Sequence, residues 1–464
     1  MNDCKINKKK IYEILCLCIL SIVICVIKDI SLIYAFVVGI IYTTIVSLKS
    51  GFKLKEIKSM AYEGVKECSS LYLIILLIGA TVSVWLSSGV VPTMIYYGLE
   101  YMQGVNFLFA SFMLISISAI FMGTAVGTIS TIGVAILGIG KGFGIPMNIL
   151  VGVIVSGAFL ADKISPISGL LNLTLATTEI NYKEAIKSAI YTMIPTMIIC
   201  AIIYYIIGIK YEDSVGINSI LELKNAMGKE FFISPYLLFL PIVIIILSII
   251  GIKSSYCMFS GIIVGSIVTC FFQKIKVLSL LKYIIFGFNA NSTSTIVNET
   301  LISGGMISMV SVIFIVIGAI ALTSILQGTG IISYLTKDII QKITSRKDLI
   351  LKTGVISSIL TVITCDQTMG IVLPSKLLKE KYKKLGVNKS ILARTISDTG
   401  TIIAPIIPWN INALIVNLVT GISCTEYFRF ALLCFVAPIV TIVFAFINTG
   451  NYKKQQKIES VKEV

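Results

Sequence analysis

Histidine is absent from this sequence, and charged residues are scarce. None of the 464 residues is a histidine, and Asp, Glu, Lys and Arg together make up 13% of the chain, whereas about a quarter of a soluble protein is charged. The missing histidine excludes a Ser/His catalytic triad, and it means that any proton carried by the protein resides on Asp, Glu or another group. The missing charge excludes a soluble enzyme, because a soluble core could not bury a chain that is 56% hydrophobic.

Paired cysteines are absent as well. The chain has 11 cysteines, but it contains no C-x-x-C pair, and most of the cysteines lie inside apolar runs. With no histidine either, the sequence offers no Cys/His metal site. The glycine-rich stretch 138–144 follows no predicted strand and precedes no P-loop lysine, so it does not predict a phosphate site. We therefore predict neither an enzyme nor a resident metal or cofactor.

Long apolar runs are what the sequence has in abundance. Its mean hydropathy is +0.96, and a membrane helix needs about 20 apolar residues. The clearest candidates are 11–27, 30–47, 69–86, 106–122, 145–161, 184–208, 232–250, 256–272, 306–326, 349–364 and 427–448. We therefore predict an all-α polytopic membrane protein. The first run has no small-residue cleavage site after it, which favours a retained helix over a removed signal peptide.

Positive charge is concentrated in short segments between these runs. The chain has 38 Lys and Arg against 23 Asp and Glu. In a soluble protein this excess would suggest nucleic-acid binding, but here it follows the positive-inside rule for cytoplasmic loops. We predict no nucleic-acid partner. The predicted partners are the lipid bilayer and a small ion or organic anion, with a homodimer left open, and the predicted location is the plasma membrane, with both termini cytoplasmic.

The two halves of the sequence resemble each other at an offset of about 240 residues. The polar segment 162–172 resembles 398–410, and weak internal symmetry of this kind is typical of secondary transporters. Loop 87–105 has neither Lys nor Arg, whereas its counterpart 327–352 has several lysines and one arginine. Corresponding loops therefore lie on opposite sides, which predicts two inverted repeats with broken or re-entrant segments near the midplane.

The predicted boundaries follow from this repeat. The first repeat spans 1–210, a linker spans 211–230, the second repeat spans 231–450, and 451–464 is a polar cytoplasmic tail. Three lysines fall on the side that this arrangement places outside: Lys274, Lys276 and Lys282.

The first polar segment combines a carboxylate with a helix-breaking proline. Four residues with side-chain oxygens follow an apolar run there: Asp162, Ser165, Ser168 and Asn172. Pro166 removes a backbone donor, so the helix should break and leave carbonyl oxygens free. Together these oxygens suit a small cation, and irregular backbone at membrane depth is tolerated only where it is buried or lines a cavity. The alternative is a cytoplasmic loop with a solvated Asp162–Lys163 pair.

The second polar segment carries the same kind of break. Pro405 and Pro408 interrupt an apolar stretch whose side-chain oxygens belong to Asp398, Thr399, Thr401, Asn410 and Asn412. If the halves are inverted, the two broken segments meet near the midplane, where transporter sites are built. The alternative for Asp398 is a structural salt pair with Arg394, four positions earlier on the same helix.

A third candidate carboxylate stands apart from these segments. The stretch 123–133, rich in glycine and threonine, corresponds to 364–370, which adds Asp366 and Gln367. Small residues also permit close helix packing, which is the alternative for the first stretch. A carboxylate within a membrane stretch is costly, so Asp366 is predicted to be functional.

These motifs resemble those of the NhaC family of Na⁺/H⁺ antiporters. Three segments carry the resemblance in order: Gly123-Thr124 with Gly127-Thr128; Ser156-Gly157-Ala158 through Asp162-Lys163-x-Ser165-Pro166-x-Ser168; and Asp398-Thr-Gly-Thr401 through Pro405-x-x-Pro408-Trp409-Asn410. The resemblance covers about residues 60–440. It implies an inverted-repeat carrier of the ion-transporter superfamily that performs secondary antiport. The family also includes exchangers that couple Na⁺ and H⁺ to malate and lactate.

Two features depart from the family pattern. Gly169, Leu170 and Leu171 stand where the family has an acidic residue and two threonines, and the histidine expected downstream is missing. We predict an antiporter that extrudes Na⁺ or Li⁺ in exchange for H⁺, with Asp162 and Asp398 or Asp366 shared between ion and proton. The alternative is Na⁺- or H⁺-coupled transport or exchange of a small organic anion, such as malate or lactate, or of an amino acid.

Overall fold

The computed structural model describes residues 5–212, 217–292 and 294–447. These residues form helices joined by short loops, and within them the only β pairing is an isolated bridge between Asn289 and Ile302. Eight helices are long and apolar enough to cross a membrane, or up to eleven if each of three bent helix pairs is one span. The chain is therefore an all-helical, multi-pass membrane protein, as predicted. The predicted tail 451–464 lies outside the described residues.

The first half of the chain contains twelve α-helices in the described residues. They are α1 (Lys8–Ile27), α2 (Leu32–Lys49), α3 (Leu54–Glu67), α4 (Ser69–Ser87), α5 (Val90–Tyr101), α6 (Phe107–Met122), α7 (Ala125–Thr128), α8 (Val134–Gly142), α9 (Met147–Ala158), α10 (Ala161–Ile164), α11 (Gly169–Thr178) and α12 (Tyr182–Glu212). A π-helical turn, η1 (Ile129–Gly133), joins α7 to α8 into one continuous span.

The second half continues with α13 to α25. They are α13 (Ile217–Glu230), α14 (Phe239–Ile249), α15 (Ser254–Phe271), α16 (Val277–Phe286), α17 (Thr295–Thr300), α18 (Gly305–Gly328), α19 (Ile331–Gln341), α20 (Arg346–Thr364), α21 (Gln367–Lys384), α22 (Lys389–Ile396), α23 (Ile411–Thr420), α24 (Cys424–Tyr427) and α25 (Leu432–Ile447). A π-helix, η3 (Ser397–Thr401), follows α22, and a 3-10 turn, η4 (Ala404–Ile406), precedes α23. Helix α13 lies within the predicted linker and packs against α5.

Burial separates an inner set of helices from an outer set. The spans Ala125–Gly142 and Met147–Thr178 are buried over most of their length, whereas α1, α12 and α15 expose large apolar side chains along one face. An apolar face turned outward is stable in lipid but not in water, so the outer helices face the bilayer. The inner helices carry the first polar segment.

Backbone breaks recur along the chain at a constant spacing of 242 residues. Gly123 and Cys365 both adopt the left-handed conformation, with φ of 69° and 60°, and an extended residue follows each. Ser168 and Asn410, also 242 apart, are the N-caps of α11 and α23. The helix ends therefore change the offset predicted from the sequence from about 240 to 242 residues. With this offset, Asn410 corresponds to Ser168 and not to Asn172.

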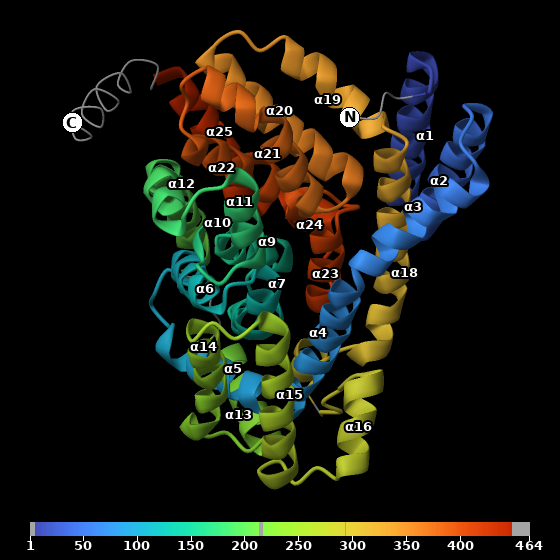
Figure 1. Cartoon of the computed structure of the whole chain (residues 1–464). Helices are drawn as coiled ribbons and strands as arrows, with labels where there is room; N and C mark the ends of the chain where they lie inside the picture. The colour runs from blue at the N-terminus through green and yellow to red at the C-terminus, as the bar shows by residue number, and fades with distance from the viewer. Residues whose placement is uncertain (1–4, 213–216, 293, 448–464) are drawn as a thin grey trace.

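The two halves also pack reciprocally. Helices α2 and α3 pack on α18, while α15 and α16 pack on α4. Helices α4 and α18 contact each other closely at Gly79, where an added Cβ would overlap the backbone of Gly305. Figure 1 shows α19 and α20 at the upper end of the molecule and α13 and α16 at the lower end.

Both polar segments break their helices where the prolines predict. Pro166 lies in the extended stretch between α10 and α11, whose Ser165 has ψ of 127°. Pro405 is the second residue of the 3-10 turn η4, and Pro408 lies between this turn and α23, where the chain bends by 45°. A carboxylate precedes each break: Asp162 on α10 and Asp398 on η3.

Candidate functional site

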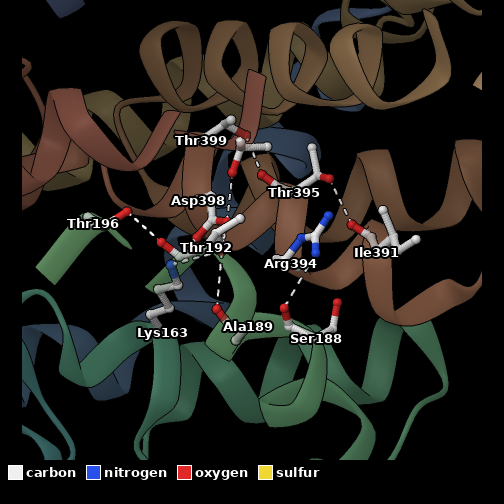
Figure 2. A network of polar contacts seen from close by, with 11 residues as sticks. Lys163, Ser188, Ala189, Thr192, Thr196, Ile391, Arg394, Thr395, Asp398 and Thr399 are labelled. Carbon is white, nitrogen blue, oxygen red and sulfur yellow. Dashed lines mark hydrogen bonds and ion pairs between the residues drawn. The ribbon is translucent and has the colours of Figure 1, made fainter. Parts of the chain in front are cut away.

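Asp398 lies at the centre of a buried polar cluster. Lys163 forms an ion pair with its Oδ1 atom, and Thr192 and Thr441 donate hydrogen bonds to its Oδ2 atom at 2.6 and 2.7 Å. The exposed fractions of the Asp398 and Lys163 residues are 0% and 2%. Figure 2 shows Lys163 and Thr192 converging on Asp398. We name these four residues the Asp398 cluster.

The ion pair in this cluster joins the two halves of the chain. Lys163 belongs to α10, and Asp398 belongs to η3, a π-helical turn of the kind often found at functional sites. Burying two charges is expensive, and their attraction seldom does more than offset that cost. A buried charge pair is therefore weak as a stabilising device, and within a membrane span it indicates function. Chemically, the Lys163 ammonium occupies a position on Asp398 that a small cation could take.

Arg394 does not pair with Asp398. Its guanidinium donates instead to the backbone oxygen of Ser188 at 3.5 Å, and Figure 2 shows it directed away from the carboxylate. The alternative of a structural pair between Arg394 and Asp398 is therefore wrong. The one-turn spacing alone did not decide the partner, because Lys163 reaches Asp398 from another helix.

Asp162 is a second buried carboxylate. Its exposed fraction is 7%, and Ser168 donates a hydrogen bond to its Oδ1 atom at 3.2 Å. The alternative of a solvated Asp162–Lys163 pair is wrong, because both side chains are buried and Lys163 pairs with Asp398. Asp162 thus has few donors for a buried carboxylate, which leaves room for a cation or a proton to bind it.

The second broken segment carries a network of side-chain amides. Gln367 donates to the backbone oxygen of Thr401 at 2.6 Å, and Asn412 donates to Gln367 Oε1 and to Asn410 Oδ1, both at 3.0 Å. Among the described residues, two buried atoms here have no hydrogen-bond partner: Asn410 Nδ2 and Thr401 Oγ1. Because unpaired buried polar groups are costly, these two atoms are available to bind a ligand or water. We name these four residues the amide network.

The remaining predicted residues have local roles. Asp366 is half-buried and is the N-cap of α21. Its carboxylate accepts a hydrogen bond from the Thr368 backbone N–H at 3.0 Å, so part of its hydrogen-bonding capacity is already used. Ser165 donates to the backbone oxygen of Ile120 at 2.6 Å. Asn172 is exposed and donates to the oxygen of Pro166 at 3.2 Å, away from Asn410, which is fully buried.

The backbone oxygens that the prolines release are partly used within the fold. The oxygen of Pro166 accepts from Asn172, and that of Pro405 accepts from Tyr427 at 2.6 Å. These two carbonyl oxygens are therefore not free to line the site, contrary to the expectation, whereas side-chain oxygens are present there as expected. Side chains satisfy these carbonyls because unpaired backbone groups at membrane depth are costly.

Sequence reasoning missed two threonines of the Asp398 cluster and treated Lys163 only as a solvated partner. Lys163 could have been found, because a charged residue beside an apolar run is a functional signal in its own right. Thr192 and Thr441 gave no such signal, since threonine in a membrane helix usually bonds its own backbone. Their role emerges only when α25 packs beside η3 and α12 packs beside the preceding helix α22.

An all-helical chain with buried carboxylates at broken membrane helices has the architecture of a secondary transporter. The sequence model of the Na⁺/H⁺ antiporter family matches residues 157–449, and the chain belongs to this family. The model of the C4-dicarboxylate anaerobic carriers matches residues 2–210. The resemblance drawn from the three sequence motifs is thereby confirmed.

Relatives of the chain are named as antiporters of different solutes. The chain is 30% identical to the Na⁺/H⁺ antiporter NhaC of Alkalihalophilus pseudofirmus over 86% of this chain and 87% of the relative. It is 26% identical to the malate-2H⁺/Na⁺-lactate antiporter of Bacillus subtilis, over 94% and 92% of the two chains. It is 25% identical to the arginine/ornithine antiporter ArcD of Halobacterium salinarum, over 84% and 81%.

Proposed function

We propose that the protein exchanges cytoplasmic Na⁺ or Li⁺ for external H⁺ in the plasma membrane, without a cofactor. The observation that carries this proposal is the pair of buried carboxylates, Asp162 and Asp398, each just before a helix break. Both lie within the part of the chain that matches the Na⁺/H⁺ antiporter family.

Competition for one carboxylate is enough to couple the two fluxes. A buried carboxylate in a medium of low dielectric constant is poorly stabilised when it is bare, so it binds either a cation or a proton. Asp162, with Ser168 as its neighbouring hydroxyl, can accept either one. Asp398 is held by Lys163 in this structure, and a cation that binds there has to displace the ammonium.

The test of this proposal is flux in proteoliposomes that contain a pH-sensitive dye. After a pH gradient is set, addition of Na⁺ or Li⁺ should dissipate the gradient, whereas K⁺ should not. A gradient that neither Na⁺ nor Li⁺ dissipates would contradict the proposal.

We further propose that the two halves are inverted repeats and that both termini are cytoplasmic. The constant spacing of 242 residues and the reciprocal packing of α15 and α16 on α4, and of α2 and α3 on α18, support a two-fold relation. Corresponding helices α5 and α19 lie toward opposite ends of the molecule in Figure 1, which supports inversion. The lysine-rich C-terminal part of α21 then faces the cytoplasm.

Cysteine labelling tests this orientation. We expect a cysteine at Gln103 in the α5–α6 loop to react with an impermeant reagent from outside intact cells, and one at Thr344 in the α19–α20 loop to react only after the membrane is opened. Both positions are exposed in the structure, whereas Ser88 near the first loop is buried. Reaction of both from the same side would contradict the inverted arrangement.

A second candidate function is exchange of a small organic anion or amino acid. The observation that favours it is the free Asn410 Nδ2 atom, because an amide N–H donates to a carboxylate oxygen and does not coordinate a cation. Counterflow with malate, lactate and arginine in the same proteoliposomes separates the two functions. Proton flux that requires one of these solutes would favour the second.

The variant Asn410→Ser tests whether the amide network binds the transported solute. Serine keeps an N-cap oxygen for α23, so the protein should fold, but it removes the free Nδ2 atom. We expect apparent affinity to fall about tenfold, the equivalent of about 1.4 kcal/mol for one lost buried hydrogen bond. The control is Asn172→Ala at an exposed position, and equal affinities in both variants would exclude the network from the site.

A further inference from the structure

Two interfaces between helices occupy corresponding positions under the 242-residue spacing, but only one of them is closed. One lies between α11 and α21, and the other lies between α23 and the continuous span of α7, η1 and α8, which corresponds to α21. The first is packed more closely than the second, which has a cavity beside it. Because the helices match at both ends, this difference is not a difference in helix length.

Polar contacts close the interface between α11 and α21. Thr177 on α11 donates a hydrogen bond to Ser375 on α21 at 3.2 Å. Glu179, just after α11, forms ion pairs with Lys379 and with Lys389, the latter at 2.9 Å. We name these three charged residues the Glu179 clamp. Hydrogen bonds from the two lysines lower the pKa of the Glu179 carboxyl to about 2, so the carboxyl stays charged at physiological pH.

A cavity of about 280 Å³ occupies the corresponding place on the other side. It lies between α8 and the end of α23 and is lined also by the loop that leads into α18. An ion pair of 2.8 Å between Lys141 and Glu299 stands in its wall. The cavity is far larger than a dehydrated cation needs, so it can admit a hydrated one.

The cavity and the clamp are built from the same positions of the two halves. Four residues that line the cavity are each 242 positions from a residue of the closed interface: Leu137 from Lys379, Met147 from Lys389, Val419 from Thr177 and Gly421 from Glu179. The fold therefore holds one pair of equivalent surfaces together and the other pair apart.

We infer that the structure is the state in which the path between α8 and α23 is open, and that the Glu179 clamp is the gate that closes the equivalent path between α11 and α21. This inference rests on the proposed exchange of Na⁺ for H⁺, which requires that the two paths are never open together, because that would dissipate the gradients. Opening the path between α11 and α21 requires the ion pairs of the clamp to break. The lysine-rich end of α21 puts this gate on the proposed cytoplasmic face.

Crosslinking the closed interface tests the gate. The hydroxyls of Thr177 and Ser375 are in contact, so the variant Thr177→Cys/Ser375→Cys, in an active background without the native cysteines, should form a disulfide on mild oxidation. We expect flux to fall at least about tenfold and to return when the disulfide is reduced. The matched control is Val419→Cys/Gly133→Cys, the corresponding pair on the cavity side, which should crosslink much more slowly. Equal rates for both pairs would overturn the inference.

The charge of the clamp is tested separately by accessibility. In single-cysteine proteins carrying Thr177→Cys, the additional change Glu179→Gln should raise labelling of this cysteine by about threefold, the shift expected from losing exposed ion pairs. Glu100→Gln, which breaks the ion pair with Lys224 on another surface, serves as the control and should leave labelling unchanged. The same labelling with and without Glu179→Gln would overturn the role of the clamp.

These measurements separate the gate from the proposed function. Crosslinking and labelling need no ion gradient, so they report the gate whatever solute is carried. If crosslinking and labelling follow expectation but no cation dissipates the pH gradient, the gate stands and Na⁺/H⁺ exchange fails. If the crosslinked protein exchanges Na⁺ at the full rate, the gate fails and the proposed function stands.

Discussion

Replacing Asp398 by asparagine is expected to abolish exchange and to destabilise the protein. The change leaves the Lys163 ammonium buried without its counter-charge, which costs about 3–5 kcal/mol when one partner of a buried pair is removed. The amide can still accept hydrogen bonds from Thr192 and Thr441, so the packing around it is kept. Flux in proteoliposomes and the thermal unfolding midpoint in detergent measure the two effects.

The double variant Lys163→Met/Asp398→Asn separates stability from transport. It removes both charges, so much of the lost stability should return, because replacing a buried ion pair by uncharged side chains is often neutral. Transport should remain absent, since the carboxylate is still missing. Full exchange in the double variant would show that the pair is only structural.

Replacing Asp162 by asparagine is expected to remove coupled proton flux while the protein still folds. Asparagine has nearly the same shape and can keep the hydrogen bond from Ser168, and burying an uncharged amide costs less than burying a carboxylate. An amide neither binds a proton at physiological pH nor attracts Na⁺ as a carboxylate does. We expect at least about a hundredfold loss of rate, the equivalent of about 2.7 kcal/mol.

A matched control distinguishes loss of the site from loss of charge in general. Asp348→Asn removes a carboxylate at the start of α20, where it is paired with Lys352 at 2.8 Å and is partly exposed. This variant should exchange ions like the wild type. Wild-type flux in Asp162→Asn would instead place Asp162 outside the coupling mechanism.

The helix breaks and the carboxylates beside them could be predicted from sequence. Proline chemistry is local, so Pro166 and Pro405 marked the breaks without knowledge of the fold. The apolar runs likewise predicted most spans, because length and hydropathy alone decide whether a helix suits a bilayer. The orientation of the halves was inferred from lysine content and stays a prediction that the labelling of Gln103 and Thr344 tests.

The partners of the carboxylates could not be predicted, because they come from distant parts of the chain. Lys163 is 235 positions from Asp398, and the two meet only when α10 packs against η3. The Arg394 prediction failed for the same reason, since helical spacing describes neighbours on one helix alone. The offset of about 240 was close, but an error of four residues was enough to pair Asn410 with Asn172 instead of Ser168.

The unequal chemistry of the two equivalent interfaces makes one of them sensitive to dissolved salt. The Glu179 clamp is exposed, and the range of its electrostatic attraction shrinks from about 8 Å at physiological ionic strength to about 3 Å at 1 M. The residues at the corresponding positions on the other side, Leu137, Met147 and Gly421, carry no charge and do not respond in this way. In the proposed orientation the clamp faces the cytoplasm, so a rise in cytoplasmic salt would weaken it. A carrier that exports Na⁺ would then open toward the cytoplasm without a separate sensing domain.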